Sequence, residues 1–321
     1  MTKILIIRFS SIGDIVLTSP IMRCVKMQKN FEIHYLTKSE YSILLSANPY
    51  VDKVFVVKHN LNYVISDLKL ENYDFIIDLH NNLRSWWVKF NLLVSSRHLQ
   101  KYNWKKYLLI YFNCNYNIDH VVDRYFEVVK KLNVVNDNNG LDYFFNENTS
   151  LDFNINQTFI AWSIGGSSIY KKLSKQQILE VVNQVSYPIV LLGGVDEISI
   201  GDILVQECSH KKIYNFCGKI SLDQSAYLIK NSALVLTNDT GLMHIAASFQ
   251  KPIISFWGCT KPSLGFSPYM TSDKSIQIIA RSSSRPCSKH GSHCRFKGNE
   301  CIKEIDSMMI LEAIENFFNL S

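Results

Sequence analysis

The sequence predicts an α/β protein of two lobes, each built on a parallel β-sheet. Short apolar segments recur along the chain with room for a helix between them, which is typical of parallel strands joined by crossover helices. The 321 residues, 47% of them hydrophobic, are enough for two cores, and two lobes create a cleft for chemistry. The predicted strands are Lys3–Phe9, Glu32–Leu36, Lys53–Val57 and Phe75–Asp78, then Phe159–Ser163, Ile189–Leu192, Ile213–Phe216, Leu234–Thr237 and Ile253–Phe256.

An asparagine-rich stretch, Asn133–Asn156, separates the two groups of strands and contains few helix-forming residues. We therefore predict a domain boundary near residue 155, with one domain at 1–155 and the other at 156–321. The segment Asp306–Phe318 has apolar residues at helical spacing behind an N-capping residue. It predicts a terminal helix that could pack back across either lobe, including the N-terminal one.

Nothing in the sequence predicts export or membrane insertion. The apolar run before Arg8 is too short for a signal peptide, and no segment approaches the roughly 18 apolar residues of a membrane span. We expect a cytoplasmic protein whose eight cysteines are reduced thiols.

Positive charge is concentrated in one part of the chain. The net charge is +6, yet no Asp or Glu occurs from Leu79 to Ile118, where six basic residues alternate with aromatic ones that include Trp86, Trp87 and Trp104. This pattern favours an anionic partner, which could be a lipid headgroup layer such as the inner face of the cytoplasmic membrane, an acidic glycan or a nucleic acid. The alternative is a solvated basic face with the tryptophans in the core.

The first strand runs into a polar turn that contains Ser10, Ser11, Gly13 and Asp14. The sequence RFSSIGD has neither the dinucleotide fingerprint nor the phosphate loop of an NTPase. In an open α/β fold the turn would direct Asp14 into the ligand-binding crevice. Alternatively, Asp14 is an acid at a helix start.

The loop after strand Phe159–Ser163 has the composition of a diphosphate site. Glycines let a ligand approach the backbone, while serines and lysines supply donors and positive charge. The residues are Gly165, Gly166, Ser167, Ser168, Lys171 and Lys172. After the next strand, Asp196 or Glu197 follows a glycine pair and could accept hydrogen bonds from sugar hydroxyls, or could start a helix.

The stretch LTNDTGLMHIAASFQKP places a helix start directly after strand Leu234–Thr237. Free backbone N–H groups at Thr240 and Gly241 could bind a phosphate. Asp239 occupies a position from which it could cap the helix. His244 lies one turn further on, where it either contacts the phosphate or packs.

These motifs together resemble glycosyltransferase family 9, heptosyltransferases that move heptose from an ADP-sugar to the lipopolysaccharide inner core. The opening KILIIRFSSIGDIVLTSPIMR, the segments IIDLHNNLRS, HVVDRYFE, GGSSIYKKL and LLGGVDE, and the signature DTGLMH with PIISFWGCT occur in the family's order. The resemblance implies a GT-B fold: two Rossmann-like domains, the N-terminal one binding acceptor and the C-terminal one binding nucleotide-sugar, with their sheets facing across a cleft.

The resemblance also implies roles for single residues. Asp14 would be the catalytic base and Lys171 would neutralise the donor diphosphate. Donor-binding residues would be Asp239, Gly241 and His244, with either Asp196 or Glu197 near the nucleoside. The residues of the glycine loop and of the helix start are expected to join them on their own chemistry, although the family often has bulkier or basic residues in place of the two serines: Gly165, Gly166, Ser167, Ser168 and Thr240. Acceptor-binding residues would be Ser10, Ser11, Gly13, His80, Arg84 and Arg124.

The expected reaction is an inverting transfer of heptose from ADP-heptose to a lipopolysaccharide core or related glycolipid at the membrane. No D-x-D motif is present, so we expect activity that survives EDTA, without a cofactor or metal. Two alternatives remain: a GT-B nucleotide-sugar epimerase, and a non-enzymatic module that binds RNA through its basic segment, although no nucleic-acid motif supports the latter.

Cys287, Cys294 and Cys301 are separated by six intervening residues each. A zinc ribbon has C-x₂₋₄-C pairs instead. The spacing therefore favours a packed thiol cluster over a metal site.

Overall fold

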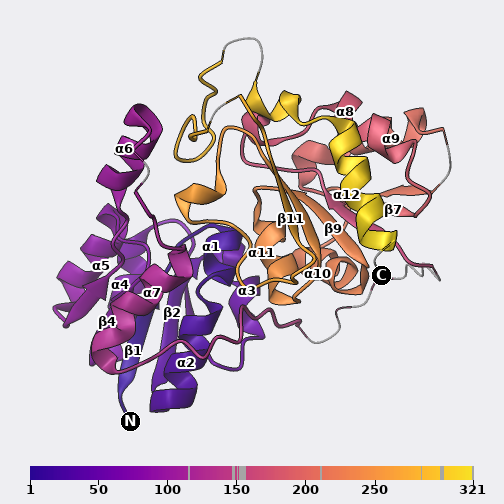
Figure 1. The fold of residues 1–321 in the computed structure, drawn as a ribbon. Coiled ribbons are helices and arrows are strands. Elements are labelled where there is room, and N and C mark those ends of the chain that lie inside the picture. Colours follow the sequence, from indigo (N-terminus) through magenta and orange to yellow (C-terminus); the bar gives the residue numbers. More distant parts are fainter. Residues whose placement is uncertain are drawn as a thin grey trace. The chain divides into compact units, whose positions relative to one another are not determined.

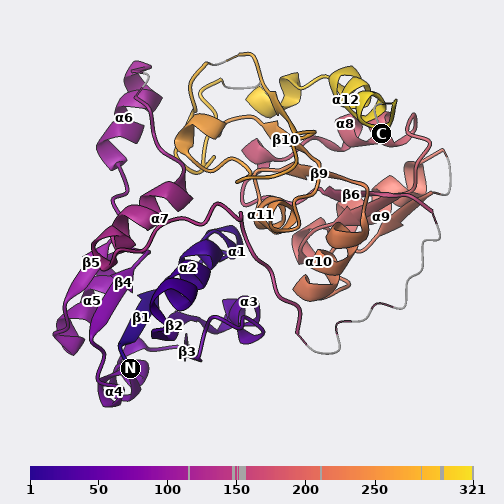
Figure 2. The same cartoon turned by 60° about the horizontal axis from the view of Figure 1, so that its bottom comes forward.

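The structure is a computed structural model that describes residues 1–114, 116–146, 149, 151, 157–209, 212–282, 284–296 and 300–319. Internal contacts divide the chain into two units (Figure 1, Figure 2): Met1–Tyr102 with Asp119–Asn148, and Asn103–Ile118 with Thr149–Ser321. The boundary predicted near residue 155 lies outside the described residues. The segment Asn103–Ile118 belongs to the second unit, although its neighbours in sequence belong to the first.

The first unit contains a five-stranded parallel sheet in the order β3-β2-β1-β4-β5. Its strands are β1 (Lys3–Ile7), β2 (Glu32–Lys38), β3 (Lys53–Val57), β4 (Phe75–Asp78) and β5 (Ser96–His98). The first four were predicted. The edge strand β5 was not, because its sequence Ser-Arg-His has no apolar run and its side chains are largely exposed.

Helices cover apolar residues on both faces of this sheet. Leu5 and Ile7 form a core with Leu68 of α4 and Val88 of α5. Successive strand residues point to opposite faces, so Ile4 lies on the other face, where it is also fully buried; α2 packs against β2 and α7. The helices are α1 (Ile12–Val16), α2 (Ser19–Lys29), α3 (Ile43–Ser46), α4 (Leu61–Leu70), α5 (Leu83–Leu92) and α7 (Val121–Val129).

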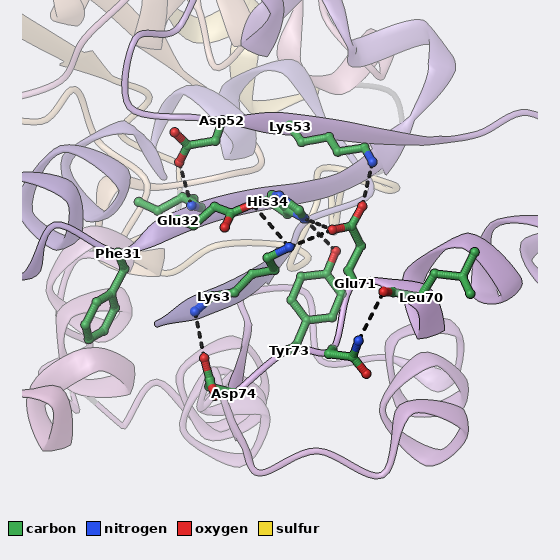
Figure 3. A network of polar contacts seen from close by, with 12 residues as sticks. Lys3, Phe31, Glu32, His34, Asp52, Lys53, Leu70, Glu71, Tyr73 and Asp74 are labelled. Atoms are coloured by element: carbon green, nitrogen blue, oxygen red, sulfur yellow. Dashed lines mark hydrogen bonds and ion pairs between the residues drawn. The ribbon is translucent and has the colours of Figure 1, made fainter. Parts of the chain in front are cut away.

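A network of ion pairs joins the first residues of these strands (Figure 3). The Lys3 ammonium lies 2.8 Å from a Glu71 oxygen and 3.2 Å from Glu32, while His34 Nε2 lies 2.9 Å from the same Glu32 oxygen. Hydrogen bonds from Lys3 and Lys53 lower the pKa of Glu71 to about 2. Lys3 already supplies the positive charge between the two carboxylates. We therefore interpret the network as ion pairs that stabilise the sheet, and not as a metal site.

The second unit contains a six-stranded parallel sheet in the order β11-β10-β9-β6-β7-β8. Its strands are β6 (Ile160–Ser163), β7 (Ile189–Leu192), β8 (Ile213–Asn215), β9 (Leu234–Asn238), β10 (Ile253–Trp257) and β11 (Ile276–Ile279). Five were predicted. The edge strand β11 was missed because only Ile278 of its four residues is buried. Two parallel sheets with helices confirm the predicted α/β class.

The terminal helix α12 packs against α8 and β11 of its own unit. It begins one residue after the predicted start and ends one residue after the predicted end. The helices of the second unit are α6 (Asn103–Phe112), α8 (Lys175–Val182), α9 (Ile198–Glu207), α10 (Leu222–Asn231), α11 (Gly241–Ser248) and α12 (Ser307–Asn319).

Candidate active site

The turn between β1 and α1 holds Asp14 in a defined position. Ser11 is the N-cap of α1, and it donates to the Asp14 carboxylate from its backbone N (3.2 Å) and its Oγ (3.1 Å). Gly13 is buried beside Asp14, and the carbonyl of Ser10 accepts a hydrogen bond from Arg8 Nε (2.7 Å). Asp14 therefore does occupy the helix-start position that the sequence left as an alternative.

Arg8 neutralises Asp14 from the end of the first strand. The distance between Arg8 NH2 and Asp14 Oδ2 is 2.6 Å. Burial raises the pKa of Asp14, but Arg8 and the hydrogen bonds from Ser11 outweigh it and hold that pKa below its usual value. Among the described residues, Arg8 and Ser11 both contact the Asp14 carboxylate through the same oxygen, Oδ2. Its Oδ1 is available to accept a hydrogen bond from a ligand.

His80 lies close enough to Asp14 to interact with its charge. Its ring packs edge-on against Phe9, with centroids 5.3 Å apart. Burial lowers the pKa of His80 to about 4, and the positive charges of Arg8 and Lys101 act in the same direction. The imidazole is therefore neutral near pH 7.

Arg124 is the other predicted acceptor residue near Asp14. It is 3% exposed, donates from Nε to the carbonyl of Asp119 (3.2 Å), and interacts electrostatically with Asp14. Arg84 is exposed in the first turn of α5 and is not among the partners of Asp14 in the described part of the chain. Of the predicted acceptor residues, the structure thus gathers all but Arg84 around Asp14.

In the second unit, strand β9 anchors the glycine loop that follows β6. Asn238, 1% exposed, donates from Nδ2 to the carbonyls of Ile164 (3.1 Å) and Gly165 (2.9 Å). At the other end, Ser168 Oγ accepts a hydrogen bond from Tyr170 N (3.3 Å) and caps the 3₁₀ turn η3 (Ile169–Lys171). Gly166 and Ser167 lie between these two anchors.

Lys171 and Asp239 form an ion pair, with Nζ and Oδ2 2.7 Å apart and both side chains less than 15% exposed. Thr240 is the N-cap of α11. The interpretation of Asp239 as that cap is therefore wrong: the chain enters the helix one residue later, which leaves Asp239 to pair with Lys171. His244 is buried one turn into the helix.

Glu197 and Asp196 differ sharply in environment. Glu197 is 6% exposed; its carboxylate lies 2.5 Å from Lys172 Nζ and accepts a hydrogen bond from Gly194 N (2.9 Å). A side chain at Gly165 would meet Glu197 Oε2 at 3.1 Å, so this carboxylate lies against the glycine loop. Asp196 is exposed. Glu197 therefore links the loops that follow β6 and β7.

Sequence reasoning missed Arg8 and Asn238. Both are polar residues at the carboxyl end of an apolar strand, where ligand-binding loops of parallel sheets begin. This position at the end of a strand is the sequence feature that could have identified both residues. Each residue acts on its neighbours, Arg8 on the charge of Asp14 and Asn238 on the path of the glycine loop.

The aromatic residues of the basic segment lie on the surface. Trp86, Trp87 and Trp104 are 55%, 41% and 58% exposed. The alternative that placed these tryptophans in the core is wrong. Among the described residues, none of the helices has the length and apolar character required to cross a bilayer.

Comparison with known proteins assigns the family. The profile of glycosyltransferase family 9 (heptosyltransferase) matches residues 63–297. The chain belongs to glycosyltransferase family 9. Lipopolysaccharide heptosyltransferase 1 of Campylobacter coli is 23% identical to it, over 98% of this chain and 99% of the relative.

Solved structures share the fold of this family 9 glycosyltransferase. The family 9 glycosyl transferase of Veillonella parvula DSM 2008 matches with a TM-score of 0.82 and 20% identity over 100% of this chain and 98% of that chain. The E. coli ADP-heptose lps heptosyltransferase II matches with a TM-score of 0.76 and 19% identity, over 99% of both chains. The family assignment favours a transferase over the epimerase and the RNA-binding module.

Proposed function

We propose that this glycosyltransferase transfers heptose from ADP-heptose to a lipopolysaccharide core or related glycolipid acceptor, with inversion and without a catalytic metal. The observation that carries the proposal is the Lys171–Asp239 ion pair, which lies between the glycine loop and the start of α11. A fixed ammonium beside free backbone N–H groups suits a diphosphate. The names of the heptosyltransferase relatives support ADP-heptose as the donor.

Asp14 acts as the general base in this proposal. Its depressed pKa keeps it ionised at neutral pH, and Arg8 and Ser11 hold Oδ2, so Oδ1 accepts the proton of the acceptor hydroxyl. The acceptor oxygen forms a bond to the anomeric carbon while the bond from that carbon to the diphosphate breaks. A single displacement of this kind inverts the configuration.

The departing diphosphate takes the electron pair of the broken bond, and its charge must be stabilised. Lys171 supplies an ammonium group, and the N–H groups at Thr240 and Gly241 supply further donors without reorganisation. Asp239 is already neutralised by Lys171, so it is a poor metal ligand. These groups account for the charge without a metal ion.

The donor is tested by a thermal-shift screen of ADP, ADP-heptose, and UDP-, GDP- and CMP-sugars. We expect ADP and ADP-heptose to raise Tm by about 5 °C at a hundredfold excess over Kd, because ligand binding stabilises the folded state. The Lys171→Ala variant should show a smaller shift with the same ligands. A larger shift with any other nucleotide-sugar would contradict ADP-heptose as the donor.

We also propose that helix α5 binds an anionic membrane that carries the acceptor. Trp86 and Phe90 stack with centroids 5.4 Å apart and are each 55% exposed. Arg84 is exposed in the first turn of the same helix, and the sequence from 79 to 118 contains no acidic residue. Exposed aromatic rings next to positive charge suit the headgroup region of an anionic bilayer.

Co-sedimentation with phosphatidylglycerol-containing vesicles at low salt tests this contact. The double variant Trp86→Ser/Phe90→Ser should bind at least about threefold less than wild type, because it loses interfacial aromatic area. Tyr63→Ser, which removes a ring 79% exposed on α4, serves as the control and should bind as wild type does. Equal binding of the wild type to neutral and anionic vesicles would exclude the proposal.

A further inference from the structure

Four cysteines of the second unit converge on one point. Cys259 follows β10, Cys287 and Cys294 lie in the loop after β11, and Cys301 starts the 3₁₀ turn η6 (Cys301–Glu304). Their four Sγ atoms all lie within 4.8 Å of one another. Cys301 Sγ lies 3.6 Å from the Sγ of Cys287 and 3.6 Å from that of Cys294.

This arrangement matches the ligand set of a tetrahedral thiolate site. Four sulfur atoms around one ion, with Zn–S bonds of about 2.3 Å, are separated by about 3.8 Å from each other. A disulfide would need about 2.05 Å, and all four cysteines are free thiols here. We propose that Cys259, Cys287, Cys294 and Cys301 bind one structural Zn²⁺ ion.

The spacing of the cysteines in the sequence does not indicate this site. The three cysteines of the C-terminal segment predicted a packed thiol cluster and no metal, because six residues separate each pair. The fold brings in Cys259 from the end of β10 as the fourth ligand. Zinc sites with four sulfur ligands are structural, and zinc is the first choice among divalent ions for four thiolates in this geometry.

The backbone around the cluster is held in place by its own contacts. Cys287 N donates to the carbonyl of Cys259 (2.8 Å). A Cβ atom at Gly258 would lie 2.7 Å from the Cβ of Ile302 and 3.0 Å from the backbone N of Ile302. The segments that carry Cys259 and Cys301 therefore touch backbone to backbone, which only glycine permits at position 258.

Burial and charge also suit a metal thiolate. Cys259, Cys287 and Cys301 are at most 2% exposed, so water has little access to the sulfur atoms. Four thiolates and one Zn²⁺ carry a net charge of −2. The buried ammonium of Lys261 interacts electrostatically with these three thiols and donates to the carbonyl of Ala280 (2.8 Å), so a fixed positive charge offsets part of that excess.

The cysteine loop, defined as residues 284–296, contacts both α6 and Lys171. Arg295 NH2 donates to the carbonyl of Ile110 (2.7 Å), and Lys289 Nζ donates to Asn103 Oδ1 (2.8 Å). Gly291 has a φ of +70°, and a side chain there would meet Lys171 Cγ at 2.8 Å. The ion would thus fix the loop that supports Lys171. That supporting role rests on the proposed function; the binding of zinc does not.

Metal analysis of the purified full-length protein tests the proposal. Wild type should contain about one zinc ion per chain, and Cys294→Ser, at the most exposed ligand, should lose most of it. Cys208→Ser is the matched control, because Cys208 is a half-buried free thiol of the same unit outside the cluster; it should keep its zinc. We expect the Tm of Cys294→Ser to fall by at least about 5 °C, and that of Cys208→Ser to change little.

A second measurement covers the case in which Cys294→Ser does not fold. A mercurial added to the native wild-type protein should release the zinc, detected with the dye 4-(2-pyridylazo)resorcinol, as the cluster thiols react. Zinc below about 0.1 per chain in protein purified without chelator, or stoichiometric iron in its place, would overturn the assignment. Neither readout depends on the donor or acceptor, so a failure here is distinct from a failure of heptosyl transfer.

Discussion

Asp14→Asn is expected to lower kcat by roughly 10²–10⁴, and to lower Tm as well, because the buried Arg8 guanidinium loses its charged partner. Asparagine keeps the size of the side chain and an oxygen that can accept from Ser11, but it cannot take a proton from the acceptor hydroxyl. The measurement is steady-state transfer from ADP-heptose with a defined acceptor. Because the pKa of Asp14 lies below its usual value, wild-type kcat should not fall between about pH 7 and pH 5 through protonation of this residue.

The control for this variant is Asp52→Asn, which removes a carboxylate paired with Lys26 at 2.7 Å in the same unit. It should retain activity within about twofold, as expected of a surface ion pair. If Asp14→Asn also stays within about threefold of wild type, Asp14 is not the base. The neutral His80 beside it would then be the next residue to replace.

Lys171→Ala should produce the second large effect, a fall in kcat of roughly 10²–10³, because one fixed donor to the developing charge of the leaving group is lost. The Michaelis constant for the donor should rise as well, since in the proposed complex the lysine also contacts the diphosphate in the ground state. Single-turnover kinetics separate the two contributions. Asp239→Asn should have a smaller effect than Lys171→Ala, because it frees the lysine without removing it.

Lys175→Ala is a matched control for this position. Lys175 forms an exposed ion pair with Glu207 at 2.8 Å, at the start of α8 in the same unit, and its removal should leave kcat within about twofold. A Lys171→Ala variant with wild-type kcat and an unchanged donor constant would mean that the ion pair with Asp239 serves the fold alone.

The sequence predicted most of the fold because the central strands of parallel sheets are buried on both faces and are therefore apolar throughout. The two missed strands, β5 and β11, lie at sheet edges, where pairing on one side and partial exposure remove that signal. The helix after the terminal cysteine segment was predicted within one residue at each end, because its capping residue and apolar spacing are local features.

The site was less predictable where it depends on distant partners. The turn that holds Asp14 is formed by consecutive residues, so the sequence placed it correctly at the end of β1. The partner of Asp239 is Lys171, which comes from another loop, so local reasoning assigned a helix cap instead. Cys259 joins its cluster only through the pairing of β10 with its neighbours, and no spacing within the C-terminal segment indicates it.

The position of α6 has a consequence for biosynthesis. This helix buries Leu109 and Ile110, and its partners Arg285, Lys289 and Arg295 are translated long after it. On the nascent chain this segment therefore lacks these partners, and its apolar residues stay exposed, until the last part of the protein leaves the ribosome. Separate expression of residues 1–155 and 156–321 would leave that helix on the wrong fragment, and the two gene halves would have to be co-expressed to recover a complete second unit.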